Sequence, residues 1–149
     1  MSTVFVVGIG ANGSGFEAAR KAADLADGTG GSIVLVFGYE SSALGPRGGP
    51  LEERVAAVGE EAVEIIRQEL ATSHPGLDVE ISLLALRPAD ALIAAAEQRP
   101  DVVIAVGHGG QGPLRAALLG NVTYEIVHRS RVPVLVVPDD AEDTITTAQ

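Results

Sequence analysis

The sequence contains no cysteine, and that absence alone excludes several kinds of chemistry. Disulfide bonds, thiolate metal sites and thiol catalysis all require the missing side chain. Histidine is scarce too: His74, His108 and His128 are scattered, and no two of them stand at the spacing of paired metal ligands. We therefore expect neither a disulfide framework nor a histidine-rich metal centre.

We expect neither a signal peptide nor a membrane span from this sequence. The stretch Met1–Val7 has no basic residues of the kind that begin a signal peptide. Every apolar run is far shorter than the roughly 20 residues that a membrane span needs. These observations predict a cytoplasmic protein without a membrane partner.

Basic residues are outnumbered by acidic residues. Ten Lys and Arg residues stand against 20 Asp and Glu residues, which gives a formal net charge of −10 at pH 7. A surface this acidic repels a phosphate backbone, so nucleic acid is not an expected partner. A small phosphate ligand stays compatible with the charge, because backbone N–H groups can hold it.

Strand-like and helix-like segments alternate along the 149 residues, a length typical of one domain. Five short apolar runs are typical of buried strands in a parallel sheet, at 4–9, 32–37, 79–86, 101–106 and 133–137. Apolar residues at helical spacing fill the intervals between them. This order predicts an α/β fold: a single doubly wound, Rossmann-like domain over residues 1–138. Its five-stranded sheet is expected to be mostly parallel, with helices on both faces, and residues 139–149 are expected to form a polar tail.

A glycine-rich segment follows the fourth predicted strand, where ligands bind in open α/β sheets. Gly107–Gly112 holds four glycines in six residues, more than a simple turn needs, which favours close approach of a ligand to the backbone. A helix that begins nearby would direct free N–H groups toward an anion. Asn121 could hydrogen-bond a phosphate or serve only as the N-cap of that helix, and Thr123 could add a hydroxyl donor.

A second glycine segment, Gly8–Gly13, matches the string G-x-G-x-x-G after the first predicted strand. The string is weak evidence alone, because an NAD site also needs an acidic residue at the end of the second strand. That strand closes with Phe37 and Gly38 instead. No Gly-Lys-Ser/Thr follows any glycine loop, so a Walker A site is not expected either.

From Val102 to Pro138 the sequence resembles the carboxyl-terminal half of the universal stress protein family. The matching features are the spaced glycines Gly107, Gly110 and Gly120, the segment Leu118–Thr123, and the closing segment Val132–Pro138. The similarity continues in order back to Val4. The resemblance implies a stress-response protein that binds an adenine nucleotide, ATP, with Mg²⁺ as the accompanying cation.

The resemblance also assigns residues and an assembly. The residues it assigns to the nucleotide are Ile9, Gly10, Ala11, Gly38, Val106, Gly107, Gly109, Gly110, Gly120, Asn121, Val122 and Thr123. Gly38 stands about where the family meets the adenine. Pairing of the last strand with its own copy implies a homodimer through Pro133–Val137, and the bound nucleotide would regulate that dimer. No catalytic residue is implied, and any ATP hydrolysis is expected to be slow because no general base stands out.

Two departures from the family leave other interpretations open. Gly10 stands where the family has an aspartate near the ribose, and Asn121 stands where it has a small hydroxyl residue. The alternative is therefore a family member that has lost nucleotide and acts as a dimeric protein-interaction module. A small-molecule enzyme using the same crevice is a third possibility, but it lacks a visible catalytic pair.

Overall fold

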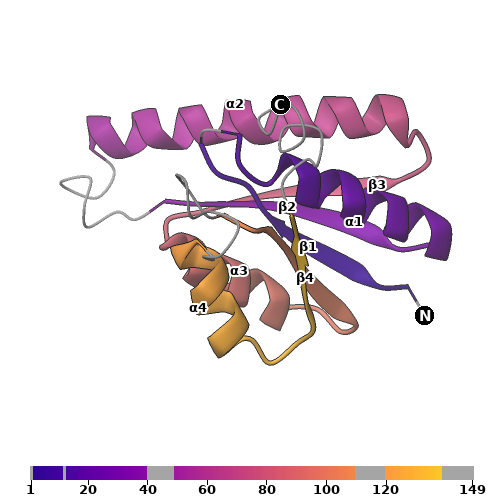
Figure 1. Ribbon diagram of the computed structural model, residues 1–149. Coiled ribbons are helices and arrows are strands. Elements are labelled where there is room, and N and C mark those ends of the chain that lie inside the picture. The colour runs from indigo at the N-terminus through magenta and orange to yellow at the C-terminus, as the bar shows by residue number, and fades with distance from the viewer. Residues whose placement is uncertain (1, 12, 40–48, 110–119, 139–149) are drawn as a thin grey trace, which may run out of the picture.

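A computed structural model describes residues 2–11, 13–39, 49–109 and 120–138. The expected tail 139–149 and the candidate residue Gly110 lie outside these ranges. Strands and helices alternate along the described chain, as the sequence predicts (Figure 1). In chain order they are β1 (Val4–Gly8), α1 (Phe16–Thr29), β2 (Ser32–Gly38), α2 (Pro50–Ser73), β3 (Asp78–Leu84), α3 (Pro88–Glu97), β4 (Val102–Gly107), α4 (Asn121–Arg129) and β5 (Val134–Val137).

The five strands form one sheet in the order β3-β2-β1-β4-β5. All four neighbouring pairs are parallel. The chain builds outward from β1 through β2 to β3, and then crosses to the other side of β1 for β4 and β5. This doubly wound order confirms the predicted fold class and puts the switch in strand order between β1 and β4. Val7 pairs with Ala105, so the carboxyl ends of β1 and β4 lie side by side.

Two helices cover each face of the sheet (Figure 1). α1 and α2 pack on one face around Val7, and α3 and α4 pack on the other around Val6. Val6 and Val7 point to opposite faces because successive side chains of a strand alternate. Both are fully buried because helices cover both faces. Burial on both faces explains why the sequences of the central strands are continuous runs of apolar residues.

Small residues bring the helices close to the sheet. The inward face of α1 consists of the buried alanines Ala18, Ala19, Ala22, Ala23 and Ala26. On α2, Gly59 lies against the ring of Phe37, where a Cβ would come within 2.1 Å of two ring atoms. No described helix is both long and apolar enough to cross a membrane.

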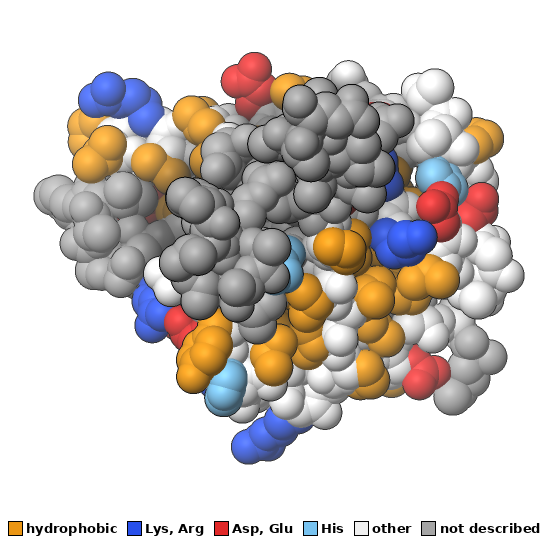
Figure 2. All heavy atoms as spheres, in the orientation of Figure 1, with side chains coloured by type: hydrophobic (Ala, Val, Ile, Leu, Met, Phe, Trp, Pro, Cys, Tyr) orange, Lys and Arg blue, Asp and Glu red, His pale blue; other side chains and the backbone are white. Residues whose placement is uncertain are grey.

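β5 forms one edge of the sheet. Its single described strand partner is β4, and the side chains of Val134, Leu135 and Val136 are half-buried. Hydrophobic side chains gather on the face of the molecule where β5 lies (Figure 2). The last strand of the chain is thus an edge strand of the described sheet.

Candidate functional site

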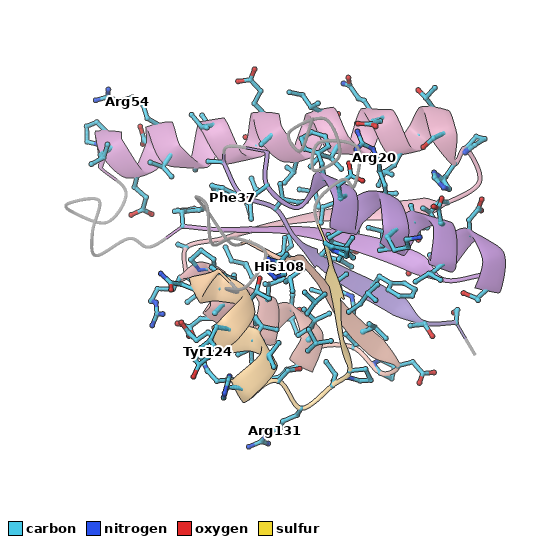
Figure 3. All side chains as sticks on the ribbon, viewed as in Figure 1. Arg20, Phe37, Arg54, His108, Tyr124 and Arg131 are labelled. Atoms are coloured by element: carbon cyan, nitrogen blue, oxygen red, sulfur yellow. The ribbon has the colours of Figure 1, made fainter. Side chains whose placement is uncertain are left out.

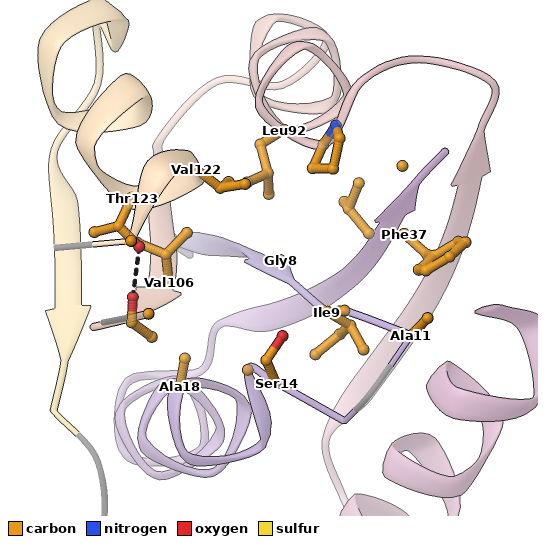
Figure 4. A pocket seen from close by; sticks show the side chains of 18 of the residues that line it. Gly8, Ile9, Ala11, Ser14, Ala18, Phe37, Leu92, Val106, Val122 and Thr123 are labelled. Carbon is orange, nitrogen blue, oxygen red and sulfur yellow. Dashed lines mark hydrogen bonds between the residues drawn. The ribbon is translucent and has the colours of Figure 1, made fainter. Parts of the chain in front are cut away.

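A cavity of about 710 Å³ lies at the carboxyl end of the sheet (Figure 4). The ends of β1, β2 and β4 line it, together with the first turns of α1 and α4. The cavity thus lies at the switch in strand order, where open α/β sheets bind their ligands. Its volume falls within the range of about 300–1,000 Å³ that is typical of small-molecule sites.

Eleven of the twelve residues that the sequence assigned to a nucleotide lie on the wall of this one cavity. They are Ile9, Gly10, Ala11, Gly38, Val106, Gly107, Gly109, Gly120, Asn121, Val122 and Thr123. The twelfth, Gly110, lies outside the described residues. Segments separated by more than half of the chain therefore meet at the position that the fold class predicts.

The glycines on the wall have different structural roles. Gly15 has φ +98°, and a Cβ there would come within 2.2 Å of the Gly8 carbonyl oxygen, so this glycine lets α1 start directly against β1. Gly38 lets α3 approach β2, since its Cβ would lie 2.8 Å from the Cβ of Ala91. Gly107 differs from both, because among the described residues a Cβ there would meet only the Gly15 nitrogen, at 4.0 Å. The described part of the chain therefore leaves room for a side chain at this point of the cavity wall.

The start of α4 presents backbone N–H groups at the cavity wall. Gly120 is the N-cap, and no side chain caps the helix, so its first-turn N–H groups have no partner from a cap. α1, α2 and α3 each carry an acidic residue in the first turn, but α4 carries none. The positive end of the α4 dipole therefore faces the cavity without a neutralising carboxylate.

The structure corrects two expectations about this helix. Asn121 is the first helical residue and not the N-cap, which is Gly120. Thr123 is buried, and its hydroxyl donates a hydrogen bond of 2.7 Å to the Gly107 carbonyl oxygen (Figure 4). Because the hydroxyl proton is in this hydrogen bond, Thr123 links α4 to the end of β4 and is not a free donor to a ligand.

Charged side chains are nearly absent from the described part of the wall. Glu17, in the first turn of α1, is the one charged residue among the described lining residues. No described Lys or Arg lines the cavity, so backbone N–H groups are the positive groups available there to an anion. Within the described ranges, no cluster of three or more acidic or histidine side chains is arranged to hold a metal ion.

Sequence reasoning missed the apolar side of the cavity. Phe37, Tyr39 and Val55 line it together with Pro88 and Leu92. Phe37 and Tyr39 flank Gly38 at the end of β2, a strand end where the sequence already predicts a ligand, but only Gly38 was assigned to the site. Val55 and Leu92 project from α2 and α3, and nothing in their local sequence separates them from ordinary core positions.

The comparison with protein families decides which kind of α/β domain this is. A model of the universal stress protein family matches residues 1–138. The chain belongs to the universal stress protein family. The match begins before β1 and ends directly after β5, so it includes every strand and helix described above.

Solved structures of universal stress proteins share the fold. One, determined in complex with cAMP, is 23% identical, with coverage of 93% of this chain and 98% of that chain and a TM-score of 0.67. The protein UspA from Lactobacillus plantarum is 19% identical over 91% of this chain and 97% of its own, with a TM-score of 0.72. A universal stress protein from Archaeoglobus fulgidus in complex with dAMP is 19% identical over 92% and 98%, with a TM-score of 0.59. No curated protein matches the sequence.

Proposed function

We propose that this universal stress protein binds an adenine nucleotide, ATP, in the cavity at the switch between β1 and β4. The observation that carries the proposal is the start of α4, whose uncapped and unneutralised first turn faces that cavity. Two relatives of the same fold are described as complexes with cAMP and with dAMP. Both of those ligands combine an adenine with a phosphate.

The lining residues fit the two ends of such a ligand. The N–H groups at the start of α4 would hold the phosphates, since the first turn of α4 presents no charged side chain to repel them. The apolar wall formed by Phe37, Tyr39 and Leu92 would receive the adenine. Mg²⁺ would arrive with the phosphates and neutralise part of their charge, as it does in sites that have few protein ligands.

The proposed role is regulatory and not catalytic. Glu17 is the single described carboxylate on the wall, and it is paired with Arg20, which leaves no evident general base for water. Any ATP hydrolysis would therefore be slow. In this proposal the bound nucleotide stabilises or reports the state of a dimer during a stress response.

The dimer would form through the free edge of β5. Its half-buried side chains and unpaired edge would be covered by antiparallel pairing with the same strand of a second copy. Analytical ultracentrifugation tests this arrangement, with Leu135→Lys as the variant, since a lysine on an edge strand opposes pairing. A wild-type monomer at micromolar concentration, or a dimer that Leu135→Lys leaves intact, would contradict it.

A second candidate function is a dimeric protein-interaction module that has lost nucleotide. Gly10 favours it, because the wall has no carboxylate at the end of β1 to hold ribose hydroxyls. Equilibrium dialysis with labelled ATP and Mg²⁺ separates the two functions. Saturable binding with a Kd below about 1 mM would support nucleotide binding. No binding at about 1 mM ATP would leave the protein-interaction module as the function.

A further inference from the structure

Gly59 lies in the interior of α2, at a position where glycine is unfavourable for a helix. Proline is the one residue with a lower helix propensity. Gly59 is the single glycine in the sequence of α2, and it is buried. A glycine inside a helix commonly serves the packing of that helix against a neighbour. The neighbour of Gly59 therefore indicates what the glycine is for.

That neighbour is the ring of Phe37, at the end of β2. Among the described residues beyond the adjacent turns of α2, the three atoms nearest to a Cβ at Gly59 would all belong to this ring, at 2.1, 2.1 and 2.7 Å. Phe37 is buried, and it lies on the side of the sheet that α2 covers (Figure 3). The ring thus occupies the space that a side chain at Gly59 would need, and α2 packs directly on it.

The same ring belongs to the wall of the nucleotide cavity. Phe37 lines the cavity together with Tyr39, and the two rings are stacked with their centroids 6.1 Å apart. Val55 of α2 also lines the cavity, about one helical turn before Gly59. Gly59 is not one of the described lining residues. It contacts the cavity through Phe37, so the position of α2 fixes the position of an aromatic side chain in the wall.

This part of the wall lies away from the start of α4. β2 and β4 are on opposite sides of β1, so their ends are roughly 10 Å apart. Figure 4 shows Phe37 and Thr123 on opposite sides of the cavity, with Gly8 between them. A ligand that has its phosphates at the start of α4 would therefore have its base beside Phe37 and Tyr39.

We propose that Gly59 is a positioning residue for the base end of the nucleotide site, and that a bound base in turn stabilises α2. The inference rests on the proposed nucleotide binding. A side chain at Gly59 would push Phe37 toward the cavity or α2 away from the sheet, and either movement changes the space left for the base. Because coupling is reciprocal, a base that binds better when α2 packs on Phe37 also stabilises that packing. α2 is then the element that responds to the base, and α4 is the element that holds the phosphates.

The test measures the affinities of Gly59→Ala, Phe37→Leu and the double variant in the full chain by isothermal titration calorimetry. The ligands are ATP with Mg²⁺, and adenosine, which has the base without the phosphates. Gly59→Ala should weaken the binding of both ligands about tenfold, because the loss is at the base. In the Phe37→Leu background the same substitution should change affinity less than about twofold, since the displaced ring is gone. Gly28→Ala in α1 is the control and should bind as wild type does, because a Cβ there meets no described atom within 4 Å.

Hydrogen exchange gives a readout that a purely structural role for Gly59 would not change. Adenosine should slow the exchange of amides in residues 55–63 of the wild type and should not do so in Phe37→Leu. Tripolyphosphate, which has no base, should slow it in neither protein. This experiment decides the question even where Gly59→Ala does not fold, and equal slowing by adenosine in both proteins would overturn the proposal.

The outcomes separate this inference from the proposed function. A wild-type protein that binds neither ATP nor adenosine would refute the nucleotide site itself. Wild-type affinity in a folded Gly59→Ala variant, with the wild type binding ATP, would overturn the role of Gly59 alone. An equal loss from Gly59→Ala with and without the Phe37 ring would overturn it as well, because Gly59 would then not act through Phe37.

Discussion

The backbones of Gly109 and Gly120 lie in direct contact, although residues 110–119 separate them in the sequence. A Cβ on Gly120 would lie 2.4 Å from the Gly109 carbonyl oxygen, and the Gly120 N–H donates to the His108 carbonyl oxygen at 3.0 Å. Gly109 has φ +77°, a conformation that favours glycine. This contact fixes the first turn of α4 over the end of β4, and so it directs the N–H groups of α4 into the cavity.

The first prediction concerns this contact. Gly120→Ala should destabilise the protein by about 1–3 kcal/mol, because the added methyl group cannot fit without moving the backbone of Gly109. Gly28→Ala is the control, since a Cβ at Gly28 meets nothing within 4 Å and its φ is not positive. It should stabilise α1 by about 0.4–1 kcal/mol. Urea unfolding measures both values, and a Gly120→Ala variant as stable as wild type would contradict the contact.

The hydrogen bond from Thr123 to Gly107 gives a second prediction. Thr123→Val keeps the size of the buried side chain but removes the donor, and it should cost about 1 kcal/mol of unfolding free energy. Thr29 also donates to a carbonyl, that of Leu25 at 2.8 Å, but it is exposed and water can replace the bond. Thr29→Val should therefore change stability by less than about 0.5 kcal/mol. Equal losses in the two variants would contradict the role assigned to Thr123.

Gly59 on α2 gives a prediction in which two effects have opposite signs. Helix propensity alone predicts that Gly59→Ala stabilises the protein by about 0.8–1 kcal/mol. The contact with Phe37 predicts destabilisation by about 1–3 kcal/mol, because the new methyl group would lie 2.1 Å from ring atoms. We expect destabilisation, and less of it when Phe37→Leu makes room in a double-mutant cycle. Stabilisation by Gly59→Ala would show that α2 does not approach Phe37 this closely.

The fourth prediction concerns pH. Arg67 donates hydrogen bonds to Glu64 and lowers the pKa of that carboxyl below its ordinary value. Stability from this pair is therefore present above the unfolded-state pKa of Glu64 and is lost as pH falls through the folded-state value. Arg67→Gln should raise the pKa of Glu64, as followed by NMR titration of its carboxyl carbon. Arg129→Gln should not alter that titration, and an unchanged Glu64 titration in Arg67→Gln would contradict the pairing.

Most of the fold could be predicted from the sequence because its signals are local. Val4–Gly8 and Val102–Gly107 are apolar along their whole length, which is what burial on both faces requires. The position of the glycines after these strands was enough to predict where the cavity lies. The edge position of β5 depends on the order of the strands, which the pairing in the sheet shows.

The remaining details of the site depend on contacts between distant segments. The sequence allows Thr123 to be a donor to a ligand, because nothing near it in the sequence shows that its hydroxyl meets the carbonyl of Gly107. Gly38 looks like a ligand position, yet its lack of a side chain is also required by the approach of Ala91 from α3.

The most direct test of the proposed nucleotide site is the affinity of Gly107→Leu for ATP, measured by isothermal titration calorimetry with Mg²⁺ present. A side chain at Gly107 would start on the cavity wall, and no described atom lies closer than 4.0 Å to its Cβ, so leucine should fill the phosphate end and leave the fold intact. Gly28→Leu is the matched control on the outer face of α1. We predict at least about tenfold weaker binding for Gly107→Leu, with Gly28→Leu equal to wild type and all three unfolding at similar temperatures. Wild-type affinity in a folded Gly107→Leu variant would contradict the site.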